Sequence, residues 1–119
     1  MRILIVEDDA PSAEAISGVL ELEGFEVRRA LTATEALEGV RAFAPEVVLV
    51  DLQLPRVEDG RSFIDAYRRG VRPAASVIVM SGRSDGRAIA TSAGADAFIP
   101  KPIDWAELLR AISLTLAAA

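Results

Sequence analysis

The chain has 119 residues, 51% of them apolar, and a net charge of −5 at neutral pH. This length suits one domain with a hydrophobic core of its own, covering residues 1–119. The acidic balance argues against direct binding of nucleic acid, which needs a basic face. The sequence contains no histidine and no cysteine, which excludes serine–histidine–aspartate and cysteine–histidine hydrolases, disulfides and thiolate metal sites.

The apolar runs of the chain are all too short to cross a bilayer, and the first two residues lead directly into a strand-like segment. The sequence therefore predicts neither a signal peptide nor a membrane-spanning helix. We expect a cytoplasmic protein without a membrane partner.

Short apolar runs alternate with stretches of helical period along the chain. Residues 2–6 form a run typical of a buried strand. The helix that follows ends at Gly24, a residue suited to a helix C-terminus. Residues 25–30 alternate in polarity enough to predict a second, outer strand. The apolar positions that recur at helical spacing in the first helix are Ala15, Ile16, Val19, Leu20 and Leu22.

The middle of the chain continues the alternation. Thr32 or Thr34 can cap a second helix, which stops before Pro45 because a residue that precedes proline disfavours the helical conformation. Residues 46–50 form the third strand. A third helix is predicted over 60–69, with Gly70 at its end. Its inward-facing residues are Phe63, Ile64 and Tyr67.

The last part of the chain adds two more units. Residues 76–80 predict a fourth strand, 85–93 a short helix that ends at Gly94, and 96–99 a fifth strand. Asp104 can cap the final helix. Five strand–helix units in strict alternation predict an α/β fold of the flavodoxin-like type. This is a doubly wound, five-stranded parallel sheet in the order 2-1-3-4-5, with helices on both faces.

Four of the predicted strands end on polar side chains. In a parallel sheet these ends lie at one edge, where open α/β sheets bind ligands. The residues at the four strand ends are Glu7, Asp8, Asp9, Asp51, Ser81 and Lys101. Carboxylates, a hydroxyl and an ammonium group should therefore lie close together.

Each of these residues taken alone has a simpler structural explanation. Asp51 could cap the next segment, Ser81 could begin a turn with Gly82, and Lys101 could lie on the surface. Carboxylates that converge, however, are costly unless a positive charge compensates them. A hard cation such as Mg²⁺, which accepts carboxylate and phosphate oxygens, fits this requirement. The set as a whole favours a site for a divalent metal and a phosphoryl group.

The chain resembles the receiver domains of two-component response regulators, from Arg2 to about Leu116. The resemblance rests on four segments, all of them at the predicted strand ends. They are Ile-Leu-Ile-Val-Glu-Asp-Asp at 3–9, Asp-Leu-Gln-Leu-Pro at 51–55, Met-Ser-Gly at 80–82, and Gly-Ala-Asp-Ala-Phe-Ile-Pro-Lys-Pro at 94–102.

The resemblance implies a role for each acidic residue. Asp51 would be the phosphoacceptor and a ligand of Mg²⁺. Asp8 would bind the metal directly, Glu7 would act through water, and the main-chain carbonyl of Gln53 would be a further ligand. Asp9 falls just past the acidic pair, and a helix cap is the better interpretation for it.

The resemblance also implies roles for the later strand ends. Ser81 matches the switch hydroxyl, and Lys101 matches the lysine that pairs with the phosphate. Phe98 falls at the position of the switch aromatic, although its sequence context by itself indicates a core residue. Gln53 and Arg83 occupy positions that tune the lifetime of the phosphoryl group in this family.

The implied function is that of a phosphorylatable signalling switch. Because the chain lacks histidine, the phosphohistidine donor must be a sensor histidine kinase or a histidine phosphotransfer protein. Phosphorylation would shift the surface made by the fourth helix, the fifth strand and the fifth helix, which controls an output partner and is a possible homodimer contact. The resemblance does not imply a classical enzyme that turns over a separate substrate. It implies magnesium-dependent self-phosphorylation from phosphodonors and slow autodephosphorylation.

Two departures from the family pattern leave alternatives open. The loop after Asp51 is slightly longer than usual, and the stretch from Ser81 to Lys101 is slightly shorter. The shortened stretch keeps open a docking or dimerisation module that works without phosphorylation. A phosphatase of the haloacid dehalogenase type also combines aspartate, serine, lysine and magnesium. Such enzymes place a second aspartate where this chain has Gln53, which argues against that class.

Overall fold

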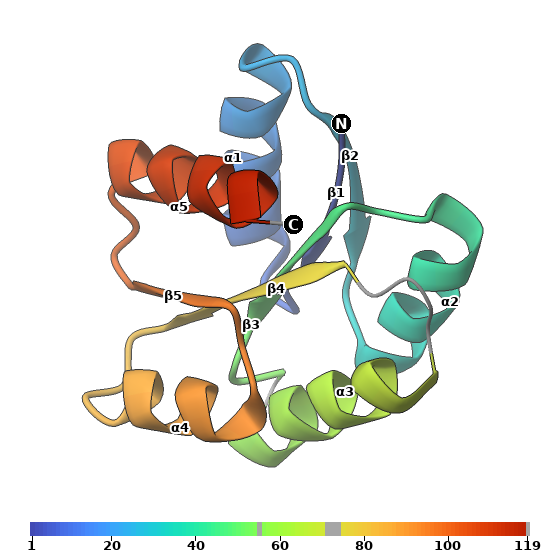
Figure 1. The fold of residues 1–119 in the computed structure, drawn as a ribbon, viewed down its shortest axis with the longest axis vertical. Helices are drawn as coiled ribbons and strands as arrows, with labels where there is room; N and C mark the ends of the chain where they lie inside the picture. The colour runs from blue at the N-terminus through green and yellow to red at the C-terminus, as the bar shows by residue number, and fades with distance from the viewer. Residues whose placement is uncertain (55, 71–74, 119) are drawn as a thin grey trace.

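A computed structural model describes residues 1–54, 56–70 and 75–118 of the chain. Ten elements alternate strictly between strand and helix (Figure 1). The strands are β1 (Arg2–Val6), β2 (Glu26–Ala30), β3 (Val47–Asp51), β4 (Ser76–Ser81) and β5 (Ala97–Pro100). The helices are α1 (Ala10–Leu22), α2 (Ala33–Phe43), α3 (Val57–Gly70), α4 (Gly86–Ala93) and α5 (Trp105–Ala118).

The five strands form one parallel sheet in the order β2-β1-β3-β4-β5, which confirms the predicted topology. All five residues of β3 are buried, as expected for a central strand that is covered on both faces. The outer strand β2 instead leaves its charged residues exposed, and only Ala30 in it is buried. The apolar runs were therefore a sound guide to which strands lie in the middle of the sheet.

Helices cover both faces of the sheet, with α1 and α5 on one side and α2, α3 and α4 on the other (Figure 1). Each layer encloses its own hydrophobic cluster because neighbouring residues of a strand point to opposite faces. On the α1 and α5 side, Ile5 and Leu49 pack with Ile16 and Ile112. On the opposite side, the core includes Leu4, Val6, Val48, Val50, Phe63 and Tyr67. No helix within the described ranges has the length and apolar character needed to span a membrane.

Three predicted helix caps are confirmed. The Asp9 carboxylate accepts a hydrogen bond from the backbone amide of Ser12 at 3.1 Å, at the start of α1. Thr32, rather than Thr34, caps α2 by accepting from the amide of Glu35. The Asp104 carboxylate accepts from the amide of Glu107 at the start of α5. In each case a short polar side chain satisfies a backbone donor that the helix leaves unpaired.

Two predictions about helices were wrong. The third helix begins at Val57 rather than at Gly60, because Asp59 accepts a hydrogen bond from the amide of Arg56 and so fixes an earlier first turn. Gly60 is a buried residue inside that helix. Leu22 of α1, which recurs at helical spacing in the sequence, is 90% exposed. It lies only two residues after the buried Leu20, which places it on another face of the helix.

Candidate functional site

The carboxyl ends of β1, β3 and β5 bring two carboxylates and one ammonium group together. Lys101, which follows β5, places its Nζ atom 3.0 Å from Oε2 of Glu7 and 3.1 Å from Oδ2 of Asp51. Strand β1 lies beside β3, and β4 lies between β3 and β5. The three side chains meet because parallel strands end at the same edge of the sheet.

Burial makes this cluster electrostatically unusual. The side chains of Glu7 and Asp51 are only 2% and 10% exposed. Burial raises the pKa of Glu7 to about 7, and the nearby Asp51 adds to the rise while Lys101 opposes it. Burial lowers the pKa of the Lys101 ammonium, but the hydrogen bond to Glu7 and the charge of Asp51 outweigh it, so this pKa is raised.

Asp8 completes a group of carboxylates that fits a divalent cation. One carboxylate oxygen each from Glu7, Asp8 and Asp51 lie within 4.8 Å of one another, and Asp8 is exposed. When all three are ionised, these carboxylates face the single ammonium of Lys101, and two negative charges are left uncompensated. Oxygen donors with this excess of negative charge suit Mg²⁺. The donor set therefore fits the metal that the sequence led us to expect.

Gln53 and Asp9, which follow two of these strand ends, make different contacts. The amide of Gln53 donates a hydrogen bond to Oδ1 of Asp51 at 3.1 Å, which orients the carboxylate from the loop after β3. The carboxylate of Asp9 is turned to the start of α1, and the hydrogen bonds from Ser12 lower its pKa. Asp9 is therefore a helix cap, while Gln53 lies beside the cluster.

Ser81 and Phe98 lie on the neighbouring strands β4 and β5. The Ser81 side chain is buried, and its hydroxyl oxygen accepts a hydrogen bond from the amide of Arg83 at 3.1 Å. The amide of Lys101 donates to the Ser81 carbonyl, which joins the ends of β4 and β5. Phe98 is half-buried, and the guanidinium carbon of Arg87 lies 5.0 Å from the centre of its ring.

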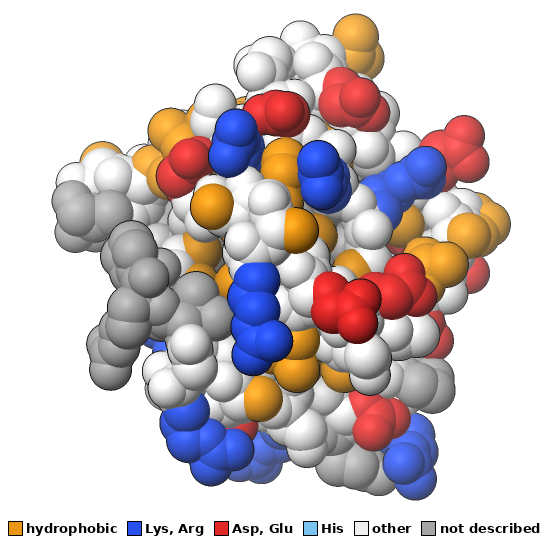
Figure 2. Space-filling model, turned by 90° about the vertical axis from the view of Figure 1, so that its right-hand side faces the viewer, with side chains coloured by type: hydrophobic (Ala, Val, Ile, Leu, Met, Phe, Trp, Pro, Cys, Tyr) orange, Lys and Arg blue, Asp and Glu red, His pale blue; other side chains and the backbone are white. Residues whose placement is uncertain are grey.

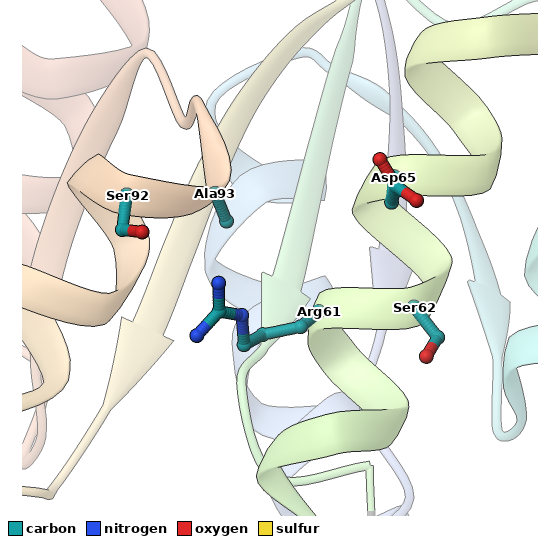
Figure 3. Close-up of a pocket in the computed structure, with 5 residues that line it drawn as sticks. All are labelled: Arg61, Ser62, Asp65, Ser92 and Ala93. Atoms are coloured by element: carbon teal, nitrogen blue, oxygen red, sulfur yellow. The ribbon is translucent and has the colours of Figure 1, made fainter.

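A pocket elsewhere on the molecule does not belong to this cluster. It lies between α3 and α4, and in Figure 3 the Arg61 side chain extends across it towards Ala93. Asp65 in this pocket is already ion-paired with Arg69. The lining residues are Arg61, Ser62, Asp65, Ser92 and Ala93. Since all of them come from the two helices, the pocket is separate from the strand ends.

The sequence matches the model of the response regulator receiver domain over residues 3–113. The chain belongs to the response regulator receiver family. It is 35% identical over 117 residues to the transcriptional regulatory protein PrrA of Mycobacterium leprae. It is also 34% identical over 118 residues to the DNA-binding response regulator MtrA of Mycolicibacterium paratuberculosis. These matches cover 97% of this chain but only 49% and 51% of the relatives, so the receiver spans about half of their length.

Solved receiver structures agree with this assignment. The signal receiver domain of a response regulator from Bermanella marisrubri has a TM-score of 0.89 and 32% identity, and the match covers 97% of each chain. A CheY-like receiver domain protein from Methanospirillum hungatei gives a TM-score of 0.85 and 33% identity, with 98% of this chain and 94% of that chain covered. The predicted fold and family are therefore both confirmed.

The relatives bear on the expectation that this receiver does not bind nucleic acid. MtrA is named a DNA-binding regulator, so that expectation is not confirmed and stays a prediction about these residues alone. The face of the receiver in Figure 2 intersperses basic and acidic side chains instead of gathering the basic ones in one patch. A mixed surface of this kind is unlike the continuous basic face that favours nucleic acid.

Sequence reasoning missed two residues beside the predicted site of the receiver. Asp85 is the N-cap residue of α4, yet its carboxylate binds Arg83. Gly86, the first residue of α4, packs so tightly that an added Cβ would lie 2.9 Å from Cβ of Ser81 and 3.1 Å from Cε1 of Phe98. The short spacing from Ser81 to Lys101 was the only signal of this crowding, and it did not single out either residue.

The raised pKa of Glu7 predicts how the stability of the metal-free receiver depends on pH. The unfolded chain releases this proton near pH 4.5, whereas the folded protein keeps it up to about pH 7. Between these values the folded state binds more protons, so rising pH should lower the free energy of unfolding by an amount on the order of 3 kcal/mol. Denaturant unfolding in the presence of a chelator, from acid to neutral pH, measures this loss.

Glu7→Gln is the matched control for this prediction, because glutamine keeps the shape of the side chain and does not ionise. Its stability should fall less over the same range of pH. A divalent cation binds the ionised carboxylate, so added Mg²⁺ should stabilise the wild-type receiver more at about pH 8 than at about pH 5. Equal pH dependence in the wild type and the variant would contradict the assignment of the buried proton to Glu7.

Proposed function

We propose that this receiver is a phosphorylation switch in which Asp51 accepts a phosphoryl group. The supporting observation is the contact of the Lys101 ammonium with both Asp51 and Glu7 at the carboxyl edge of the sheet. The carboxylates of Glu7, Asp8 and Asp51 would hold Mg²⁺, with the main-chain carbonyl of Gln53 as a further ligand. Bound there, the metal supplies positive charge that neutralises the phosphoryl oxygens.

The reaction follows from the position of the Asp51 carboxylate. The Gln53 amide and the Lys101 ammonium hold its two oxygens at 3.1 Å each. One of these oxygens attacks phosphorus and forms a new P–O bond, while the P–N bond of the donor phosphohistidine breaks. The electron pair of that bond stays on the imidazole nitrogen. Because Asp51 attacks as a carboxylate, it has no proton to lose, and the step needs no general base.

The residues around Asp51 would then respond to the new charge. Lys101 can exchange its bond with Asp51 for one with a phosphoryl oxygen, and the Ser81 hydroxyl can donate to another. Movement of Ser81 would affect Phe98, because both side chains pack against Gly86. We propose that this shifts the population of conformations at the surface formed by α4, β5 and α5.

The partners follow from the same chemistry. The phosphoryl donor would be a phosphohistidine outside these 119 residues, on a sensor kinase or a phosphotransfer protein, because this sequence contains no histidine. The α4-β5-α5 surface would contact the output partner or a second copy of the receiver. We place these exchanges in the cytoplasm. For a longer regulator that contains this receiver, a DNA-binding output is a proposal suggested by the name of MtrA.

Direct phosphorylation tests the proposed function. The receiver is incubated with Mg²⁺ and acetyl phosphate or phosphoramidate, and its intact mass is recorded with and without a chelator. We expect one added phosphoryl group that requires the metal and is removed by hydroxylamine, as an acyl phosphate is. An unmodified protein would favour the docking module, and rapid release of phosphate without an adduct would favour a phosphatase. Either result would overturn the proposal.

A further inference from the structure

We propose that Asp85 is a positioning residue that holds Arg83 away from the phosphorylation site until Asp51 is modified. The two side chains form a bidentate pair in the loop between β4 and α4. Nε of Arg83 lies 2.8 Å from Oδ1 of Asp85, and Nη2 lies 3.0 Å from Oδ2. Both carboxylate oxygens thus bind the guanidinium. This inference rests on the proposed function, since it concerns the group that Asp51 receives.

The carboxylate of this pair also stands at the start of α4, which it leaves uncapped. Asp85 is the N-cap residue of α4, a position where aspartate usually accepts from a backbone amide of the first turn. Within the described part of the chain, the Asp85 side chain accepts no such capping hydrogen bond. Asp9 and Asp104, which start α1 and α5, do bind first-turn amides. The carboxylate of Asp85 therefore has two competing uses, and Arg83 occupies it in this structure.

Arg83 is connected directly to the switch serine. Its backbone amide donates to the hydroxyl oxygen of Ser81. Ser81 follows Met80, which lies opposite Asp51 in the sheet, and the Ser81 carbonyl binds the amide of Lys101. A guanidinium that leaves Asp85 is therefore attached to the backbone at the rim of the cluster. In the proposed phosphorylated state, its long side chain turns from there towards the phosphoryl group on Asp51.

The charges decide which partner Arg83 prefers. The side chains of Arg83 and Asp85 are 42% and 52% exposed, and exposed ion pairs of this kind contribute little because water screens them. A phosphoryl group brings more negative charge than one carboxylate and offers three oxygens to a bidentate guanidinium. Phosphorylation should therefore draw Arg83 towards Asp51. The freed Asp85 carboxylate would then cap α4 by accepting from the amide of Arg87 or Ala88.

This exchange has two measurable consequences. Arg83 placed over the phosphoryl group obstructs the in-line attack of water, so its presence should lengthen the lifetime of the acyl phosphate. A capped α4 should hold its first turn more firmly, because the N-terminal amides of the helix gain an acceptor. Phosphorylation would in this way be coupled to the start of α4, on the proposed output surface.

The test compares Asp85→Asn, Arg83→Ala and the double variant with the wild-type receiver. Each is phosphorylated with acetyl phosphate and Mg²⁺, the donor is removed, and loss of the adduct is followed by intact mass. Asp85→Asn removes the competing charge and keeps a side chain that can cap. Its adduct should last about two- to fivefold longer than that of the wild type, the factor that an exposed ion pair represents. Arg83→Ala should shorten the lifetime.

The double variant separates positioning from a merely structural effect. If Asp85 acts through Arg83, then Asp85→Asn should not change the lifetime when Arg83 is already alanine. Hydrogen exchange adds an independent readout. Phosphorylation should slow exchange of the first-turn amides of α4 in the wild type but not in Asp85→Ala, which cannot cap.

The outcomes distinguish this inference from the function on which it rests. If the lifetime of the adduct is the same in the wild type and Asp85→Asn, the role of Asp85 is overturned but the proposed function is not. The role of Asp85 would also be overturned if Asp85→Asn changed the lifetime of the adduct equally in the wild type and in Arg83→Ala. Failure of the wild-type receiver to form any adduct would instead overturn the proposed function and this inference with it.

Discussion

Asp51→Asn should abolish the phosphoryl adduct that acetyl phosphate and Mg²⁺ produce on the wild-type receiver. Asparagine has nearly the shape of aspartate, but its amide oxygen is a poor nucleophile and carries no charge to bind metal. Asp51 lies at the end of β3 with its two oxygens held by the Gln53 amide and the Lys101 ammonium. Intact mass after incubation, followed by peptide mapping of the wild-type adduct, measures the loss and its location.

Asp9→Asn is the matched control for Asp51→Asn. Asp9 is the next acidic residue along from Glu7 and Asp8, but its carboxylate accepts from the Ser12 amide at the start of α1. Asparagine caps helices about as well as aspartate does, so α1 should keep its first turn. We expect this variant to retain the adduct. An adduct that persists in Asp51→Asn, or disappears in Asp9→Asn, would contradict the assignment of the phosphoacceptor.

Gly60→Ala should destabilise the receiver by about 3 kcal/mol, although alanine normally strengthens a helix. Gly60 lies within α3 and is buried against the loop after β3. A Cβ atom there would overlap the carbonyl oxygen of Leu52 and would lie 2.8 Å from its carbonyl carbon. Backbone atoms cannot rotate away as a side chain can, so α3 or the loop would have to move. Denaturant unfolding measures the loss.

Gly18→Ala provides the opposite expectation for the same change. Gly18 lies inside α1 on an exposed face, and apart from its chain neighbours and the backbone of its own helix no described atom lies within 4 Å of the position that its Cβ would take. Alanine there should stabilise the receiver by about 1 kcal/mol, because it lowers the entropy lost when the helix forms. A gain of stability in both variants would contradict the close approach of Gly60 in α3 to the backbone of Leu52.

The positions of the strands and most helix caps were predictable because they depend on local patterns. The apolar runs identified β1, β3 and β4, and the short polar residues Asp9 and Asp104 identified the start of two helices. The start of α3 was not predictable in the same way. A glycine such as Gly60 usually disfavours a helix interior, but here the approach of the Leu52 backbone requires a residue without a side chain.

The same distinction applies to the site. The sequence by itself placed Glu7, Asp8, Asp51 and Lys101 at one edge, because residues that end parallel strands share that edge. It could not show which groups would touch. The 3.0 Å contact between Lys101 and Glu7 joins residues separated by 94 positions, and the burial that raises the pKa of Glu7 comes from the surrounding fold.

The sequence determined the family, the topology and the residue types at the strand ends, since these depend on periodicity and on the order of residues along the chain. Only the tertiary structure decided how the charges are paired and where backbones meet. The pairing of Arg83 with Asp85 and the crowding of Gly86 against Ser81 are examples. The reason is physical: desolvation and steric exclusion depend on every neighbour within a few ångströms, and most of those neighbours are distant in sequence.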